Sequence, residues 1–139
     1  MITLYSPMDK NFIYWVAASG GVKAGQIVKS ATGAAPVAAA HTGQTILGLA
    51  MEDAEAGTAA KIYPLGGTVL EIDYDSASAT QTATDSMLGT LYDIKVDSTS
   101  GEMTLDLADT TGAFCFLVGY DNTNKKARIV VDEADLLIT

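Results

Sequence analysis

The fold of this chain is decided by two stretches, AASGGVKAGQIVKS (Ala17–Ser30) and ILGLAMEDAEAGTAAKIYPLGGTVLEI (Ile46–Ile72). In both, short apolar runs alternate with turns that contain glycine, and Ile46–Ala50 and Ala59–Tyr63 are the clearest of these runs. Runs of this length that end at Gly or at small polar residues are typical of β-strands. Because no helical period of apolar residues is sustained, we predict an all-β protein.

Later segments repeat this pattern more loosely. The matching pairs are Gly25–Val28 with Leu88–Tyr92, Ile46–Ala50 with Leu117–Tyr120, and Ala59–Tyr63 with Lys126–Val130. We therefore predict a single β-domain at residues 17–139, a small β-barrel-like or β-sandwich-like structure. Two related strand-and-turn units, at about residues 17–74 and 87–131, build this domain. Residues 1–16 are expected to form an extended N-terminal arm and a first strand.

Alternation of apolar and polar residues identifies individual strands in the second half. Leu91–Asp97 and Glu102–Leu107 alternate cleanly around a tight turn, which predicts a β-hairpin. Phe114–Tyr120 is apolar on both faces, so we expect a central, buried strand. Pro36–Ala39 is expected to be a short strand, and Asp75–Ser86, which has no large apolar residue, a surface loop.

Composition limits the range of functions. The 139 residues fit one domain that can fold without a metal or a disulfide. The formal net charge is −9, which argues against nucleic-acid binding because phosphate contacts need clustered Lys and Arg. The single cysteine, Cys115, lies in an apolar run and is expected to be a small buried residue. Neither a secretory signal nor an apolar run of ~20 residues is present, so we expect a soluble protein made in the cytoplasm.

No pattern of residues predicts catalysis. His41 is the only histidine and has no Ser-His-Asp or Cys-His arrangement around it, and one His with one Cys cannot supply a four-ligand zinc site. Glu71, Asp73 and Asp75 share one face of an expected strand, and we expect that face to meet solvent. We therefore predict a protein that is not an enzyme.

The glycine pairs do not predict a cofactor site either. Gly20–Gly21 and Gly66–Gly67 lack the surrounding residues of phosphate-binding loops, so we interpret them as turns. We predict no catalytic residue, no bound cofactor and no metal.

Four aromatic residues near the N-terminus are the candidate binding residues: Tyr5, Phe12, Tyr14 and Trp15. One interpretation is that they pack in the core. The other is that they anchor an interface, because exposed Trp and Tyr are frequent hot-spot residues.

Several segments of the chain together resemble a known family. They are GGVKAGQIV (Gly20–Val28), LGLAMEDAEAGTAAKI (Leu47–Ile62) and GGTVLEI (Gly66–Ile72), and in the second half LGTLYDI (Leu88–Ile94), SGEMTLD (Ser100–Asp106), FLVGYD (Phe116–Asp121) and KARIVV (Lys126–Val131). This series of turns and strands is similar to that of the small capsid decoration, or cement, proteins of tailed bacteriophages.

The resemblance implies a β-barrel-like protein, often trimeric, that binds the outer face of a capsid where major capsid proteins meet and reinforces the shell without catalysing a reaction. The expected partners are the major capsid protein and further copies of the chain in a homotrimer, with no nucleic acid and no membrane. The expected location is the outer capsid surface of the virion, after synthesis in the host cytoplasm. The alternatives are a small ligand- or carbohydrate-binding β-domain of a surface assembly and, more remotely, a hydrolase with paired carboxylates.

Overall fold

The computed structural model describes residues 1–5, 9–38, 41–74 and 81–139, and its regular structure consists of β-strands and two short 3-10 turns. The strands are β1 (Thr3–Leu4), β2 (Ile13–Val16), β3 (Ile27–Ala31), β4 (Gly33–Pro36), β5 (Ile46–Ala50), β6 (Ala59–Tyr63), β7 (Leu70–Asp73), β8 (Leu91–Val96), β9 (Met103–Asp106), β10 (Cys115–Asp121) and β11 (Lys126–Val131). The turns are η1 (Asp85–Met87) and η2 (Glu133–Asp135). The prediction of an all-β protein is confirmed.

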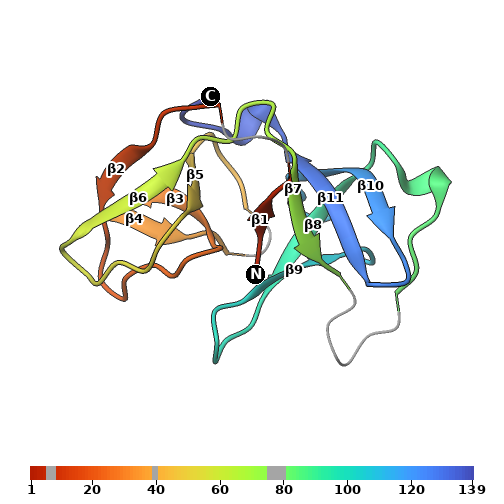
Figure 1. Cartoon of the computed structure of the whole chain (residues 1–139), viewed down its shortest axis with the longest axis horizontal. Helices are drawn as coiled ribbons and strands as arrows, with labels where there is room; N and C mark the ends of the chain where they lie inside the picture. The colour runs from red at the N-terminus through yellow and green to blue at the C-terminus, as the bar shows by residue number, and fades with distance from the viewer. Residues whose placement is uncertain (6–8, 39–40, 75–80) are drawn as a thin grey trace.

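The strands form two antiparallel sheets that lie side by side (Figure 1). One has the order β2-β6-β5-β3-β4 and the other the order β1-β7-β11-β10-β8-β9. We call β2–β6 the first unit and β7–β11 the second unit. β1 is added to the outer edge of β7, between the two units in Figure 1.

The two units have the same topology. In each, the spatial order is first, fifth, fourth, second and third strand of the unit. Each sheet curls so that its first and third strands meet at one parallel bridge, Ala17 with Ala34 in the first unit and Tyr74 with Leu105 in the second. Within the described residues the strand pairing does not continue around either sheet. The units are therefore curled sheets packed in a sandwich-like manner, and neither is a closed barrel.

The registers of the two units also correspond, counted from these bridges. The corresponding ladder pairs are Tyr14–Lys61 with Glu71–Arg128, Leu49–Tyr63 with Phe116–Val130, Ile27–Leu49 with Leu91–Phe116, and Ser30–Ala34 with Ile94–Leu105. A turn hydrogen bond repeats as well, because Gly25 N–H donates to Ala50 O and Gly89 N–H donates to Leu117 O, each at 2.8 Å. The chain therefore contains an internal structural repeat, in which the second unit has the same topology and register as the first.

The segment matches made on the sequence are right for two pairs and out of register for the third. Gly25 corresponds to Gly89, and β6 corresponds to β11, as matched. The second match joined the right strands, β5 and β10, but aligned Gly48 with Gly119. The ladders show instead that Gly48 of the first unit corresponds to Cys115 of the second. The two glycines have different surroundings, since a Cβ on Gly48 would lie 2.2 Å from Tyr63 O, while Gly119 follows a bulge in β10.

The unit boundaries in the structure differ from those expected from the sequence. The topology assigns β2 (Ile13–Val16) to the first unit and β7 (Leu70–Asp73) to the second, whereas sequence analysis placed these segments before and inside the first unit. The short strand expected at Pro36–Ala39 lies earlier, at Gly33–Pro36, because it pairs with β3 across a tight turn.

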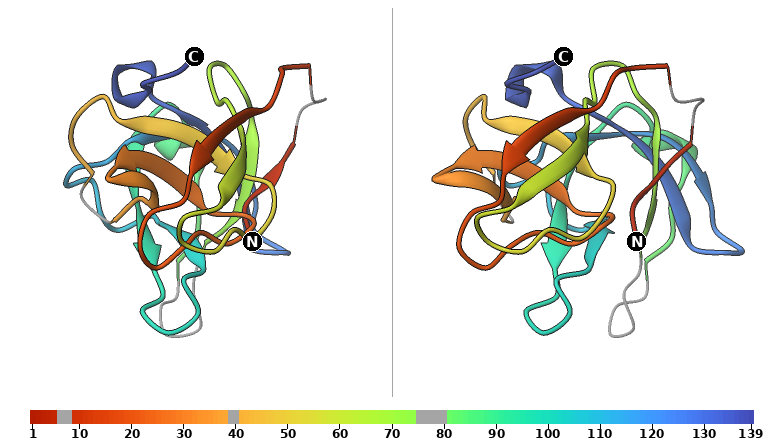
Figure 2. Two further views of the ribbon diagram at one scale, coloured as in Figure 1. Left: turned by 90° about the vertical axis from the view of Figure 1, so that its left-hand side faces the viewer. Right: turned by 60° about the vertical axis from the view of Figure 1, so that its left-hand side comes forward.

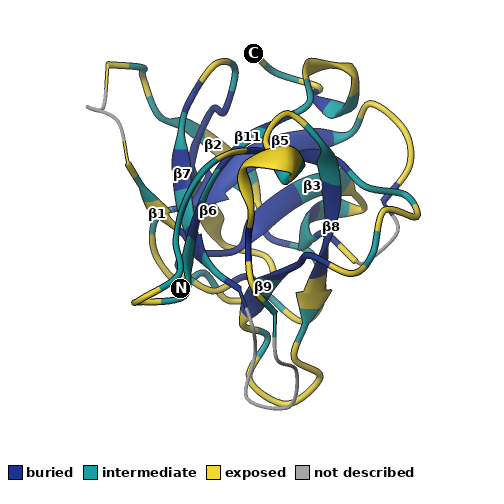
Figure 3. Ribbon diagram, turned by 90° about the vertical axis from the view of Figure 1, so that its right-hand side faces the viewer, coloured by how far each residue is buried: buried dark blue, intermediate teal, exposed yellow. Residues whose placement is uncertain are grey.

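The molecule has two hydrophobic cores, and the larger one holds the two units together. The smaller core lies inside the first unit and consists of Ala17, Val22, Val28, Ala34, Leu47, Ala50, Ala60 and Ile62. The larger core joins the inward side chains of the second unit, such as Ile72 and Leu105, to side chains of the first unit, such as Leu49. Figure 3 shows the buried strand segments gathered inside the molecule and the loops exposed. Four of the eight side chains of the smaller core are alanines, which suits the close packing of a tightly curled sheet.

Several finer expectations can be compared with the described residues. The hairpin formed by β8 and β9 is confirmed. β10 is central in its sheet, but the expectation that both its faces are buried is wrong, because Val118 is 47% exposed and Phe116 is partly exposed. The loop expected at Asp75–Ser86 is described only from residue 81, and Asp75 lies outside the described residues.

Candidate interaction surfaces

The four candidate aromatic residues do not form one patch. Tyr14 is 62% exposed and Tyr5 is 50% exposed, whereas Phe12 and Trp15 are partly buried and pack against the larger and the smaller core, respectively. Tyr5 follows β1 on the second unit, and Tyr14 lies on β2 of the first unit. The core-packing interpretation therefore describes Phe12 and Trp15, and the interface interpretation remains open for Tyr5 and Tyr14.

Tyr5 and Phe12 hold the N-terminal segment against both units. Lys61 Nζ lies 4.3 Å from the ring centroid of Phe12, and Arg128 Cζ lies 4.2 Å from that of Tyr5. Lys61 and Arg128 occupy corresponding positions of the repeat. A cation over an aromatic ring is stabilising by about 0.5–1 kcal/mol at exposed sites. Each unit therefore holds one N-terminal aromatic ring with the cation at the corresponding position of the repeat, Lys61 in the first unit and Arg128 in the second.

Tyr14 and Val16 form the centre of an exposed apolar surface on the first unit. Both side chains point outward from β2 and are 62% and 57% exposed, and their ladder partners on β6 are Lys61 and Ala59. We call these four residues the β2 surface. Figure 2 shows β2 and β6 side by side on the outside of the first unit.

The repeat shows that the apolar character of the β2 surface is particular to the first unit. The positions in the second unit that correspond to Tyr14 and Val16 are Glu71 and Asp73. Asp73 forms an ion pair with Lys126 at 2.5 Å, as a solvated sheet surface commonly does. The same strand position is thus apolar on one unit and charged on the other, so the sheet geometry does not require an exposed tyrosine.

A second exposed apolar surface lies on the outer side of β8, β10 and β11. Leu91, Phe116 and Val130 lie in one row across these strands and are all partly exposed. Leu88 is 42% exposed and Val118 is 47% exposed, beside the hydrogen bond from Gly89 N–H to Leu117 O that joins their segments. We call these five residues, Leu88, Leu91, Phe116, Val118 and Val130, the β10 face. This surface was not predicted from the sequence, because a strand that is apolar on both sides normally indicates burial.

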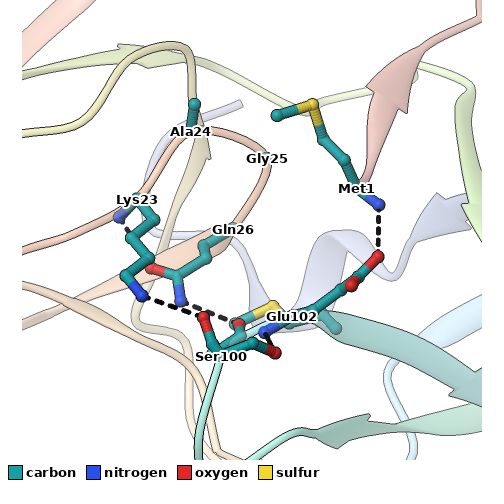
Figure 4. Close-up of a pocket in the computed structure, with 9 residues that line it drawn as sticks. Met1, Lys23, Ala24, Gly25, Gln26, Ser100 and Glu102 are labelled. Atoms are coloured by element: carbon teal, nitrogen blue, oxygen red, sulfur yellow. Dashed lines mark hydrogen bonds and ion pairs between the residues drawn. The ribbon is translucent and has the colours of Figure 1, made fainter.

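At one edge of the contact between the two units, polar groups line an open pocket of about 230 Å³ (Figure 4). Gln26 Nε2 donates to Gly101 O at 2.9 Å, and Lys23 Nζ donates to Ser100 O at 3.0 Å. On the other side of the pocket, the amino group of Met1 lies 2.8 Å from Glu102 Oε1. These groups are bonded across this edge, which fixes the β2–β3 loop of the first unit to the β8–β9 turn of the second.

The single histidine has a structural environment. His41 is buried, its ring packs edge-on against Phe114 with centroids 5.4 Å apart, and its Nε2 lies 2.9 Å from Gly43 O. Among residues 1–5, 9–38, 41–74 and 81–139, no three His, Cys, Asp or Glu side chains come together as a potential metal site.

Cys115 is fully buried, as predicted from its apolar surroundings. Burial raises the pKa of its thiol far above the usual range, and the nearby negative charges of Asp93 and Asp135 raise it further. A thiol reacts as the thiolate, so this cysteine is unreactive in the folded protein.

Comparison with models of known protein families and with curated proteins finds no match to this chain. In the part of the chain that the structure describes, no helix has the length and apolar character needed to cross a membrane.

Proposed function

We propose that the protein is a capsid decoration protein of a tailed phage, which binds the outer surface of the assembled head and stabilises it. Its partners are the major capsid protein and further copies of this chain, as a homotrimer. The resemblance of the turn-and-strand segments to that family supports this proposal, as does the all-β fold in which those segments recur as two equivalent units.

The observation that carries the proposal is the β2 surface. Tyr14 and Val16 expose large apolar side chains at positions where the repeat has Glu71 and Asp73. Exposed tyrosine is enriched at the centres of protein interfaces, where it contributes a large contact area at a small cost in conformational entropy. We therefore assign the β2 surface to the contact with the capsid.

Binding alone accounts for head stabilisation. A protein that binds the assembled shell and not its dissociated subunits stabilises the shell by mass action. In a trimer three such contacts act together, so contacts that are weak one by one give a long-lived complex. The formal net charge of −9 keeps the protein soluble, and the proposed location is the outer capsid surface after synthesis in the host cytoplasm.

The test is co-sedimentation of the purified protein with phage heads that lack it. We expect the wild-type protein to pellet with the heads, and the Tyr14→Ser variant to bind about tenfold or more weakly because an interface anchor is lost. Leu137→Ser is the matched control, because Leu137 is also exposed but lies near the C-terminus.

Equal binding by wild type and Tyr14→Ser would remove the β2 surface from the proposal. Saturable binding of the isolated protein to glycans, together with no binding to heads, would replace the proposal with a carbohydrate-binding function.

A further inference from the structure

The contact between the two units buries one apolar row of the first unit. Ile27, Leu49 and Tyr63 lie side by side across β3, β5 and β6, on the side of the sheet opposite to the smaller core. All three are buried in the larger core, together with side chains of the second unit. Ile27 N–H also donates to Met103 Sδ of β9 at 3.4 Å. In the first unit this apolar row is therefore covered by the second unit of the same chain.

Among the residues that the structure describes, the second unit presents the same row on its outward face, where the three side chains are partly exposed. The repeat places Leu91, Phe116 and Val130 at the positions of Ile27, Leu49 and Tyr63, because the ladder pairs Leu91–Phe116 and Phe116–Val130 correspond to Ile27–Leu49 and Leu49–Tyr63. These side chains belong to neither core and are partly exposed, and exposed Leu88 and Val118 extend the surface. Together they are the β10 face, on β8, β10 and β11 at the right of Figure 1.

We propose that the β10 face is covered by a second copy of this chain, in a head-to-tail contact that repeats the contact between the two units. The row is apolar in both units, although Tyr14 and Val16 of β2 correspond to the charged residues Glu71 and Asp73 of β7. A row of apolar side chains on an outward face indicates an interface, because monomeric proteins rarely expose large contiguous apolar patches.

The structure also supplies the complementary surface on the second copy. In the chain, the apolar row of the first unit meets β9 of the second unit, and the β8–β9 turn bonds to Gln26 and Lys23. The corresponding elements of the first unit are β4 and the β3–β4 turn, where Ala31 and Thr32 are exposed. The β10 face of one copy thus meets the β3–β4 end of the next copy.

A head-to-tail contact uses two different surfaces on each copy, so it generates a ring when the rotation closes. Three copies would place six equivalent units in such a ring. This proposal rests on the self-association that is part of the proposed function, and it assigns that self-association to the β10 face. It does not depend on the capsid, because it concerns the isolated protein in solution.

The test is the mass of the purified full chain in solution, measured by sedimentation velocity over a range of concentrations. The wild-type protein is expected at about 43 kDa, three times the chain mass of 14.4 kDa. Two variants change the β10 face: Phe116→Ser, and Val118→Asp at the exposed bulge, which places a charge there without disturbing the core. Both are expected to shift to the monomer mass of 14.4 kDa. Tyr14→Ser is the control and is expected to keep the wild-type mass.

Circular dichroism separates loss of assembly from loss of folding, and Val118→Asp is expected to keep the wild-type β-sheet spectrum. A wild-type protein that stays monomeric at every concentration would overturn the inference. An unchanged mass for the folded Val118→Asp and Phe116→Ser variants would also overturn it. If these variants kept their mass and lost only head binding, the β10 face would belong to the capsid contact instead, and the inference would again be wrong. Loss of head binding by Tyr14→Ser with its mass unchanged leaves this inference intact, so the two proposals fail separately.

Discussion

Gly48 of β5 leaves no room for a side chain against the neighbouring strand β6. A Cβ at this position would lie 2.2 Å from Tyr63 O and 2.7 Å from Ile62 Cγ2. A carbonyl oxygen fixed in a strand cannot move aside as a flexible side chain can. The β5–β6 pairing therefore depends on glycine at this position, although the corresponding residue of the second unit is Cys115.

We predict that Gly48→Ala lowers the free energy of unfolding by about 3 kcal/mol, because the backbone must shift to admit the methyl group. Urea unfolding followed by circular dichroism measures this change. Gly57→Ala is the control, because its added Cβ meets open space and only its φ of +82° is unfavourable, at a cost of about 1 kcal/mol. Equal losses for the two variants would contradict this explanation.

Asp106 is a nearly buried carboxylate held in its charged form. Burial acts to raise its pKa, but Ala108 N–H, Gln81 Nε2 and Lys95 outweigh this effect, and the pKa lies below its usual value of 3.8. The hydrogen bonds from Ala108 and Gln81 measure 3.0 and 2.9 Å, and Lys95 Nζ lies 3.6 Å away. Because the unfolded chain binds this proton more readily, the carboxylate contributes stability above pH 3.8 that is lost as the pH falls through the lower pKa of the folded state.

We predict that Asp106→Asn lowers the free energy of unfolding by about 1 kcal/mol at pH 7, through the loss of charge-assisted hydrogen bonds. The difference from wild type should shrink as the pH falls below 3.8, where the unfolded chain binds the proton, and should disappear once the pH passes the lower pKa of the folded state. Urea titrations at pH 7 and pH 3 test this. A difference that is constant or grows on acidification would be incompatible with the proposed charge.

At the scale of elements, β1 shows how the N-terminal segment belongs to the fold. The sequence predicted an extended arm. In the structure Thr3 pairs with Glu71 and Leu4 with Leu70, and Ile2 is buried in the larger core. β1 therefore closes one edge of the second unit.

We predict that Ile2→Ala destabilises the protein by about 2–4 kcal/mol, the usual cost of removing a large aliphatic side chain from a core. Tyr5→Ala is expected to cost about 0.5–1 kcal/mol, because Tyr5 is half exposed and loses mainly its contact with Arg128. Thermal unfolding of both variants makes the comparison. If Tyr5→Ala proved as damaging as Ile2→Ala, burial of β1 would not explain its attachment.

Much of each element was predictable from alternation of apolar residues. Leu70 and Ile72 of β7, and Met103 and Leu105 of β9, point inward as the pattern indicated, because a strand places alternate side chains on opposite faces. The exposure of Val118 could not be predicted in this way. Whether the outer face of a central strand is buried depends on a second layer that covers it, and the local sequence does not encode that layer.

The same limit explains why the sequence could not show that the four candidate binding residues lie on different surfaces. Tyr5, Phe12, Tyr14 and Trp15 are close in sequence, but β1 and β2 belong to different sheets, so the group is divided between two units. The β2 surface retains Tyr14 from that prediction. The β10 face became visible only when the repeat aligned Phe116 with the buried Leu49.

At the scale of the whole molecule, the two equivalent units have unequal surroundings. The apolar row of the first unit is covered by the second unit, whereas the corresponding row of the second unit faces outward. The β2 surface is apolar where the second unit carries charge. A duplicated scaffold thus presents two different apolar surfaces, which we assign to a second copy of the chain and to the capsid.

The most direct test of the proposed function is a cryo-electron microscopy reconstruction of phage heads saturated with this protein. The reconstruction is expected to show the protein on the outer surface of the shell, with Tyr14 and Val16 of β2 against major capsid protein and the β10 face against a neighbouring copy. Heads without added density, or density in which β2 faces solvent, would contradict it.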